Sequence, residues 1–280
     1  MDPEVIFAAA ATLFGPDAAK TTAVQDVYQG AAAYDQADID EVLRAFDSKH
    51  MIRLSLNGQT AQATLAGKTA FEDGSLATLT LGTRFLIEQS RDAVVHLIVE
   101  GTQGESGGSG FFAAEFENCV VTAAHVVRDR AVLRIEDRQG NVICRRPDGV
   151  ILGPHELDIA LVRCQTPVGV RPLQIEWRPE AIEPLNEVLI LGYPPFPNHH
   201  PALFHASANI HAAAVDYQGK NKLVISSVTR PGCSGAPVIS AGGFVVGIVE
   251  QANTLEQLNE NITFFTATIA RHVSEIIIAP

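Results

Sequence analysis

From residue 83 onward, the chain consists of short apolar segments separated by Gly, Pro, Asn and Asp. The segments read DAVVHLIVEG, GSGFFAAEFENCVVTAAHVV, AVLRIED, IALVRCQ, NEVLILGYP, KLVISSVT and GGFVVGIVEQ. Short strands at this spacing, with few helices between them, are typical of antiparallel sandwiches and barrels. The sequence therefore predicts a mainly β domain over residues 83–280. We expect GTQGESGGSG at 101–110 to be a hairpin loop and TFFTATIARHVSEII to be a last strand followed by a helix.

Residues 1–82 have a different spacing of apolar residues. Apolar residues recur at helical spacing in three stretches that begin near Val5, Val24 and Ile39. Alternating residues at 52–56 precede Asn57-Gly58, a dipeptide that favours the tight turn of a β-hairpin. The segment LAGKTAFE then predicts a short helical turn. We therefore expect a small α+β domain that ends at residue 82.

The element order over about residues 1–80 resembles a winged-helix domain, and an unrelated small helical domain is the alternative. The third helix would expose four acidic residues beside one basic residue: Asp38, Asp40, Glu41 and Asp47 beside Arg44. Phosphate would be repelled by such a face. The resemblance therefore implies a regulatory or adaptor domain that contacts a protein partner rather than DNA.

The composition and charge further restrict the classes of binding partner that we expect. The net charge is −12, and acidic residues outnumber basic ones in both domains, whereas nucleic-acid binding needs clustered Lys and Arg. The longest apolar run, Val5–Phe14, is shorter than the roughly 18 residues that span a bilayer. It follows Asp2 and Glu4, whereas a secretory signal begins with positive charge. We expect a cytoplasmic protein with neither nucleic acid nor membrane as a partner.

Cysteine and histidine residues do not predict a metal site. No C-x-x-C pair occurs among Cys119, Cys144, Cys164 and Cys233. Without an export signal, free thiols are expected rather than disulfides. A histidine-rich stretch includes His199 and His200, but adjacent residues on a strand face opposite ways, so they would not share a metal ion. We expect no cofactor and no metal.

The stretch TRPGCSGAPVIS has the chemistry of a nucleophile turn. Gly232 allows the backbone to turn so that the amides of Gly232 and Ser234 point at one spot, as an oxyanion hole requires. Ala236 stands where the G-x-S-x-G elbow of α/β-hydrolases needs glycine, so that fold is excluded. Whether Ser234 or the neighbouring Cys233 attacks is open at this point.

A serine hydroxyl needs a base, and the base needs a buried carboxylate to orient it. His125 in VTAAHVV follows an apolar strand and small residues that leave room for an imidazole. Asp158 in LDIALVR has apolar neighbours, and a buried carboxylate requires a partner. These residues are the candidate base and orienting acid.

The order His, Asp, Ser within TAAH, DIAL and G-x-S-G-x-P resembles the trypsin-like serine proteases, over roughly residues 85–280. The spacing resembles the compact cores of bacterial HtrA-type proteases without their PDZ domains. The resemblance implies a double β-barrel and protein or peptide substrates. It also implies that His125 is the general base, Asp158 its orienter and Ser234 the nucleophile, with Gly232 and Ser234 forming the oxyanion hole. Cys233 occupies the family's variable position before the nucleophile.

The substrate-binding residues depart from the family pattern. The family's substrate-pairing strand usually reads Ser-Trp-Gly, where this chain has Glu250, Gln251 and Ala252. A carboxylate at residue 250 could repel Asp158 and perturb the triad. Val228 would form an apolar pocket wall, which predicts small or medium apolar side chains at the cleavage site.

The sequence thus predicts a serine endopeptidase that is regulated by its N-terminal domain. The alternative is a catalytically inactive trypsin-like fold that serves as a protein-binding module. A third hypothesis, a DNA-binding regulator that cleaves itself, would need a basic third helix, which the sequence lacks.

Overall fold

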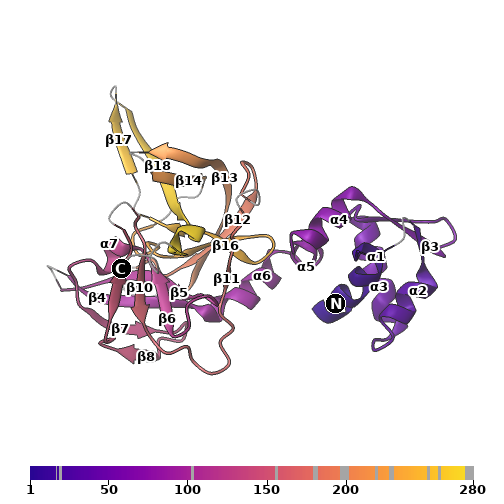
Figure 1. Cartoon of the computed structure of the whole chain (residues 1–280), viewed down its shortest axis with the longest axis horizontal. Coiled ribbons are helices and arrows are strands. Elements are labelled where there is room, and N and C mark those ends of the chain that lie inside the picture. Colours follow the sequence, from indigo (N-terminus) through magenta and orange to yellow (C-terminus); the bar gives the residue numbers. More distant parts are fainter. Residues whose placement is uncertain are drawn as a thin grey trace. The chain divides into compact units, whose positions relative to one another are not determined.

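The structure of the chain is a computed structural model. It describes residues 1–16, 18, 21–101, 104–154, 157–178, 182–195, 202–217, 220–226, 230–250, 253–257 and 260–274. Backbone contacts divide the chain into two compact units, Met1–Leu86 and Ile87–Pro280 (Figure 1). The sequence-based boundary after residue 82 falls between two helices close to this division.

The first unit is an α+β fold with its own apolar core. Its elements are α1 (Pro3–Phe14), β1 (Thr21–Ala23), α2 (Val24–Gly30), α3 (Gln36–Ser48), β2 (Ile52–Leu54), β3 (Thr60–Ala63), α4 (Leu65–Glu72) and α5 (Leu76–Leu81), and α6 (Thr83–Ser90) follows. The first three helices and the hairpin of β2 and β3 lie where the sequence predicts them. β1 was not expected, and it pairs with β3 to give the sheet order β1-β3-β2.

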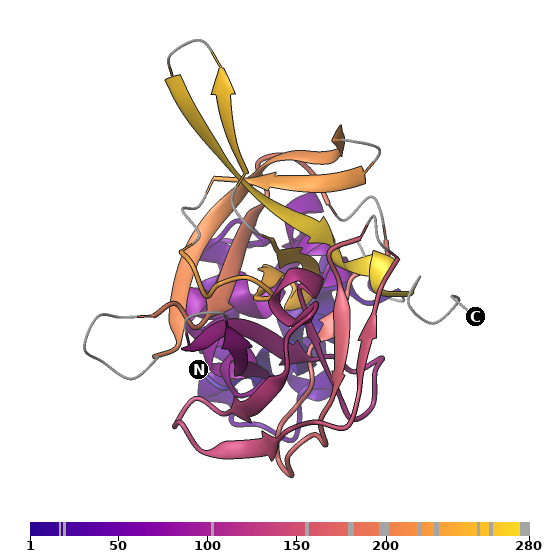
Figure 2. The same cartoon turned by 90° about the vertical axis from the view of Figure 1, so that its left-hand side faces the viewer.

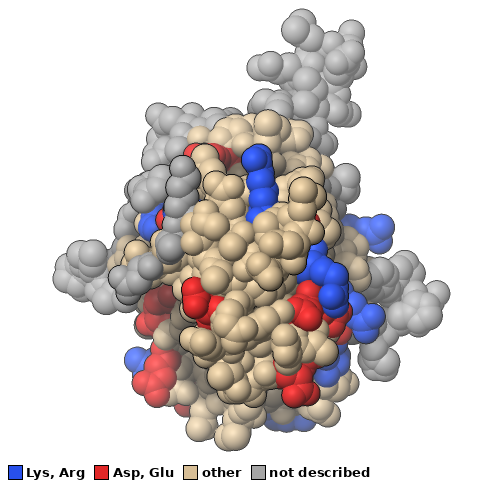
Figure 3. Space-filling model, turned by 90° about the vertical axis from the view of Figure 1, so that its right-hand side faces the viewer, with Lys and Arg blue, Asp and Glu red and all other residues tan. Residues whose placement is uncertain are grey.

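The outer face of α3 is acidic. Ile39, Val42 and Phe46 bury one stripe of this helix, which leaves Asp38, Glu41, Arg44 and Asp47 exposed on the other side. Asp40 is half-buried, and it accepts a hydrogen bond of 2.5 Å from the Tyr28 hydroxyl. Figure 3 shows acidic and basic side chains interspersed among uncharged ones over one face of the molecule.

The second unit is mainly β, and its fold class is confirmed as a pair of antiparallel barrel-like sheets. Its elements are η1 (Arg91–Ala93), β4 (Val94–Gly101), β5 (Gly104–Phe112), β6 (Cys119–Thr122), α7 (Ala124–Val127), β7 (Val132–Glu136), β8 (Val142–Arg145), β9 (Val150–Leu152), β10 (Ala160–Arg163), β11 (Gln174–Ile175), β12 (Glu187–Gly192), β13 (Phe204–Tyr217), β14 (Lys220–Ile225), β15 (Pro237–Ser240), β16 (Phe244–Val249), β17 (Asn253–Gln257), β18 (Glu260–Ile269) and η3 (Ala270–Ser274).

The first sheet of this unit has the order β8-β7-β4-β5-β6-β10-β9. Part of the stretch predicted as a hairpin loop is instead strand β5, which pairs with β4 along its whole length. The prediction was wrong because glycine normally weakens a strand. Here a Cβ at Gly107 would lie 2.5 Å from His96 Nε2, and one at Gly108 would lie 2.6 Å from Val126 Cγ1. The glycines therefore let neighbouring side chains pack directly against the strand.

The second sheet closes into a six-stranded barrel. Its order is β11-β16-β15-β12-β13-β14-β18-β17, and a further pairing of β16 with β18 completes the ring. The β17–β18 hairpin extends away from this barrel (Figure 2). After β18, Ala270–Ser274 form a 3-10 turn, where the sequence predicts a C-terminal helix. The first sheet, which is not closed in this way, and the second barrel place the loops that carry His125, Asp158 and Ser234 within one unit.

Candidate active site

His125 and Asp158 form a two-point contact. The ring Nδ1 of His125 lies 2.6 Å from Asp158 Oδ2, and the His125 backbone N–H donates to Oδ1 at 2.8 Å. His125 lies on the one-turn helix α7, whose first N–H groups have no partner within the helix. Asp158 precedes β10, which pairs with β6 directly before α7. The carboxylate thus caps the helix and fixes the ring with Nε2 facing away.

The Asp158 carboxylate is held in its charged form. Burial by itself raises the pKa of Asp158. Hydrogen bonds from the His125 side chain and backbone, with the positive charges of His125 and Lys222, outweigh this effect. The pKa of Asp158 is therefore lower than its usual value. An ionised carboxylate at Nδ1 stabilises the imidazolium that forms when Nε2 takes a proton.

Two amides of the turn that contains Ser234 have no acceptor among the described residues. The N–H groups of Cys233, Gly235 and Ala236 donate to Arg230 O, Val249 O and Cys233 O. Within the described part of the chain, the N–H groups of Gly232 and Ser234 donate no hydrogen bond. Gly232 has a φ of +90°, a conformation that glycine adopts without strain. Two free amides of this kind are the donors that an oxyanion hole needs.

The Ser234 turn packs against the strand that leads to His125. Gly235 has a φ of +85°, and a Cβ there would lie 2.1 Å from Ser109 O and 2.3 Å from Thr122 Oγ1. Ser234 O accepts a hydrogen bond of 2.8 Å from Ser109 N. Among the described residues, no hydrogen bond joins Ser234 Oγ to His125. Catalytic hydrogen bonds are often long before substrate binds.

Cys233 points away from solvent. Its side chain is fully buried in the apolar core of the second barrel, whereas Ser234 is only half-buried. Burial raises the pKa of the Cys233 thiol, with small opposing effects from Arg230. A buried thiol with a raised pKa is a poor nucleophile.

Of the predicted substrate-binding residues, only Glu250 can be placed. Val228, Gln251 and Ala252 lie outside the described residues, as do His199 and His200. The Glu250 side chain is 6% exposed and contacts Lys222 Nζ. Lys222 gives the Glu250 charge a partner of opposite sign, which the sequence motifs do not indicate.

Ser109 was missed by the sequence analysis. It is fully buried, and its Oγ donates to Gly232 O at 2.7 Å and accepts from Tyr193 N at 2.8 Å. The Ser109 N–H also donates to Ser234 O, so Ser109 binds the carbonyls of both proposed oxyanion-hole residues. The GSGFF motif contains this serine, but nothing in the motif indicates partners 84 and 123 residues away.

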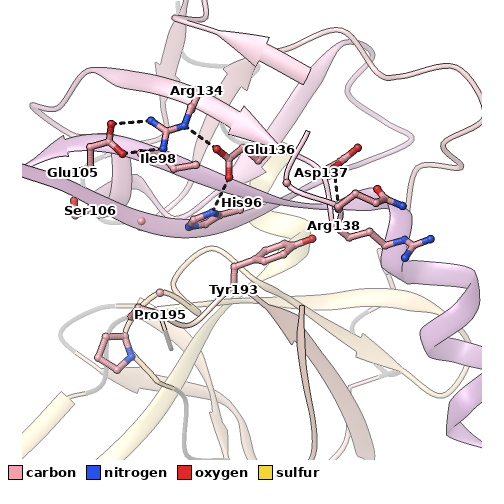
Figure 4. Close-up of a pocket in the computed structure, with 15 residues that line it drawn as sticks. His96, Ile98, Glu105, Ser106, Arg134, Glu136, Asp137, Arg138, Tyr193 and Pro195 are labelled. Atoms are coloured by element: carbon pink, nitrogen blue, oxygen red, sulfur yellow. Dashed lines mark hydrogen bonds and ion pairs between the residues drawn. The ribbon is translucent and has the colours of Figure 1, made fainter. Parts of the chain in front are cut away.

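A cavity of about 800 Å³ lies beside the same turn (Figure 4). Pro231 and Gly232 line it, together with Tyr193 and His96, whose rings lie 5.4 Å apart. On its other side, Arg134 bridges two glutamates with hydrogen bonds of 2.7 to 2.8 Å. Its lining includes none of the three triad candidates.

The arrangement of barrels, His–Asp contact and glycine-framed serine agrees with a family comparison. A model of the trypsin-like peptidase domain matches residues 108–248, which is half of the chain. The chain therefore belongs to the trypsin-like peptidase family. A search of curated proteins found no match to it.

Solved structures show the same fold. The HtrA-type protease AlgW, solved with a tripeptide, is 17% identical, with a TM-score of 0.56 over 69% of this chain. A serine endoprotease from Yersinia pestis is 16% identical, with a TM-score of 0.53 over 70% of this chain. The match spans only 61% and 65% of those two chains. None of the helices described here has the length and apolarity to cross a membrane.

Proposed function

We propose that this protein is a serine endopeptidase that hydrolyses peptide bonds through His125, Asp158 and Ser234. The observation that carries the proposal is the two-point contact between His125 and Asp158. Such a contact fixes the tautomer in which Nε2 accepts a proton. Family membership and the free amides of the Ser234 turn support the same chemistry.

In the proposed reaction, the Ser234 Oγ–H bond breaks as its proton passes to His125 Nε2 and Oγ attacks the peptide carbonyl carbon. The amides of Gly232 and Ser234 stabilise the negative oxygen of the tetrahedral intermediate. The His125 imidazolium then gives its proton to the leaving amine, and an acyl-enzyme forms. Water, activated by the same histidine, releases the acyl group and restores the serine.

Labelling with a serine-directed fluorophosphonate, detected by intact mass, tests the nucleophile on the full chain. We expect wild type and Cys233→Ala to gain one adduct and Ser234→Ala to gain none. Turnover of a peptide library by wild type would then establish hydrolysis and the preferred cleavage site. A folded full chain and a folded 83–280 fragment that both fail to label and to cleave would overturn the proposal and favour the protein-binding module.

We also propose that residues 1–82 form a winged-helix-like regulatory or adaptor domain that binds a protein partner. The supporting observations are a separate apolar core and the acidic exposed face of α3, including Asp38, Glu41 and Asp47. A protein surface with basic side chains would complement this face.

A further inference from the structure

The cavity beside the Ser234 turn contains a buried polar atom that has no hydrogen-bond partner among the described residues. This atom is Nδ1 of His96, a residue that is 7% exposed. Glu136 Oε2 lies 3.7 Å from Nδ1, which is too far for a hydrogen bond, and both residues line the cavity (Figure 4). Buried polar groups are normally hydrogen-bonded, so these two acceptors indicate a ligand that donates hydrogen bonds.

The charges around the cavity favour a cation. Among the described residues, the lining includes three carboxylates and two guanidinium groups, on Glu105, Glu136, Asp137, Arg134 and Arg138. Arg134 already donates to two glutamates at 2.7 to 2.8 Å, and Arg138 donates to Asp92 at 2.5 Å. Burial lowers the pKa of His96 more than Glu136 raises it, so this ring adds no charge at neutral pH. An anion would have to displace a bound carboxylate, whereas a cation complements the excess negative charge.

The cavity also has an aromatic wall. The rings of His96 and Tyr193 lie 5.4 Å apart with 30° between their planes, and Pro195 and Pro231 extend this wall. Lysine and arginine bury their methylene stems along apolar surface while the charged end reaches polar groups. The volume of about 800 Å³ is within the range of ligand pockets. These features fit a basic side chain better than a bare metal ion.

The Ser234 turn places this cavity on one side of the bond that would be cleaved. At the end after Ser234, Gly235 N donates to Val249 O at 2.8 Å, directly before Glu250, where the substrate-pairing segment is expected to begin. At the end before Ser234, Gly232 lines the cavity. A peptide whose carbonyl oxygen lies at the amides of Gly232 and Ser234 would therefore reach β16 with the part before the bond and the cavity with the part after it.

We propose that the cavity binds a lysine or arginine side chain of the substrate, within the first two residues after the cleaved bond. Glu136 Oε2 accepts from the cation, and His96 Nδ1 accepts a second hydrogen bond when Nε2 carries the ring proton. The Tyr193 ring packs against the methylene stem. This inference rests on the proposed function, since it takes Ser234 as the nucleophile. It concerns the opposite side of the bond from the apolar pocket that is expected at Val228.

Cleavage of a peptide library by the full chain, followed by mass spectrometry, tests the preference. We expect lysine and arginine to be enriched at the first two positions after the cleaved bond. In Glu136→Gln, kcat/KM for an arginine peptide should fall at least about fivefold, as for loss of a charged hydrogen-bond partner, and that for the matched norleucine peptide less than about twofold. No enrichment in wild type, or an equal loss for both peptides in the variant, would overturn the proposal.

The matched control is Glu176→Gln in the same unit. Glu176 is 5% exposed and pairs with Arg178, but it does not line the cavity. The ratio of kcat/KM between the arginine and norleucine peptides should stay at the wild-type value in this variant. A ratio lowered as much as in Glu136→Gln would show that losing any buried carboxylate has this effect, and would refute the role of Glu136.

Peptide binding separates this proposal from the proposed function, because it needs no turnover. Ser234→Ala is titrated in a calorimeter with Arg-Ala-Ala amide and Ala-Arg-Ala amide, and with their norleucine counterparts. At least one arginine peptide should bind at least about fivefold more tightly than its counterpart, and adding Glu136→Gln should remove this difference. Failed labelling with this binding pattern would count against the endopeptidase only, whereas successful labelling without the binding difference would count against the cation site only.

Discussion

At the scale of single residues, the decisive feature is the charge on Asp158. Its carboxylate accepts from both the ring and the backbone of His125, and its pKa is lower than the usual value of 3.8. A carboxyl whose pKa is lower in the folded than in the unfolded state stabilises the fold at pH values above its unfolded-state pKa. This contribution is lost as the pH falls through the folded-state pKa.

Asp158→Asn therefore has a pH-dependent effect on stability. At pH 7, we expect the variant to melt at a lower temperature than wild type, because the charged partner of His125 is gone. As the pH falls through the lowered pKa of Asp158, the carboxyl of wild type becomes protonated and the two melting temperatures should converge. Thermal unfolding followed by circular dichroism at several pH values measures this difference. A gap that stays constant from pH 7 to pH 2 would contradict the assigned ionisation.

At the scale of elements, strand β5 organises the Ser234 turn. The fully buried Ser109 contacts the carbonyls of Gly232 and Ser234, and glycines before it let the neighbouring side chains approach. The strand thus fixes the turn from the first sheet, while hydrogen bonds from Gly235 N to Val249 O and from Val249 N to Ala236 O fix it from the second.

Ser109→Ala should loosen this turn. The change leaves Gly232 O and Tyr193 N without their hydrogen-bond partner, at a cost of about 1–3 kcal/mol. We expect a lower free energy of unfolding in urea and slower fluorophosphonate labelling. Ser106→Ala, on an exposed position of the same strand, is the control and should change neither. Equal behaviour of the two variants would refute the role of Ser109.

At the scale of the whole molecule, two units with separate cores share one chain. The strands of the second unit pair only with one another in the described sheets. The proposed regulation by the first unit therefore does not depend on strands shared with the second unit.

A fragment of residues 83–280 tests that regulation. We expect it to fold, with circular dichroism typical of a β protein, and to label faster than the full chain if residues 1–82 restrain the site. Full chain and fragment should also capture different partners at equal concentration. Equal labelling rates together with identical partners would refute a regulatory or adaptor role for the first unit.

The sequence by itself determined the local elements. Alternation and turn residues placed most of the strands, and helical spacing placed the first three helices of the first unit, because these patterns depend on neighbouring residues. The motifs around His125, Asp158 and Ser234 identified the candidate site, since each needs only a few adjacent residues. The β5 prediction failed because local propensity counts against glycine, whereas packing required it.

Only the tertiary structure decided which distant groups meet. Ser109 reaches Gly232 across 123 residues, and Lys222 reaches Glu250 across 28. Neither pair has a sequence signature, because the local residue pattern does not show whether a serine or a lysine on a strand is exposed to solvent or buried. Barrel closure likewise decided that the Glu250 charge is paired, because it brings β14, β16 and β18 together. Local patterns thus specify the strands and motifs, and the pairing of remote strands specifies the electrostatics of the site.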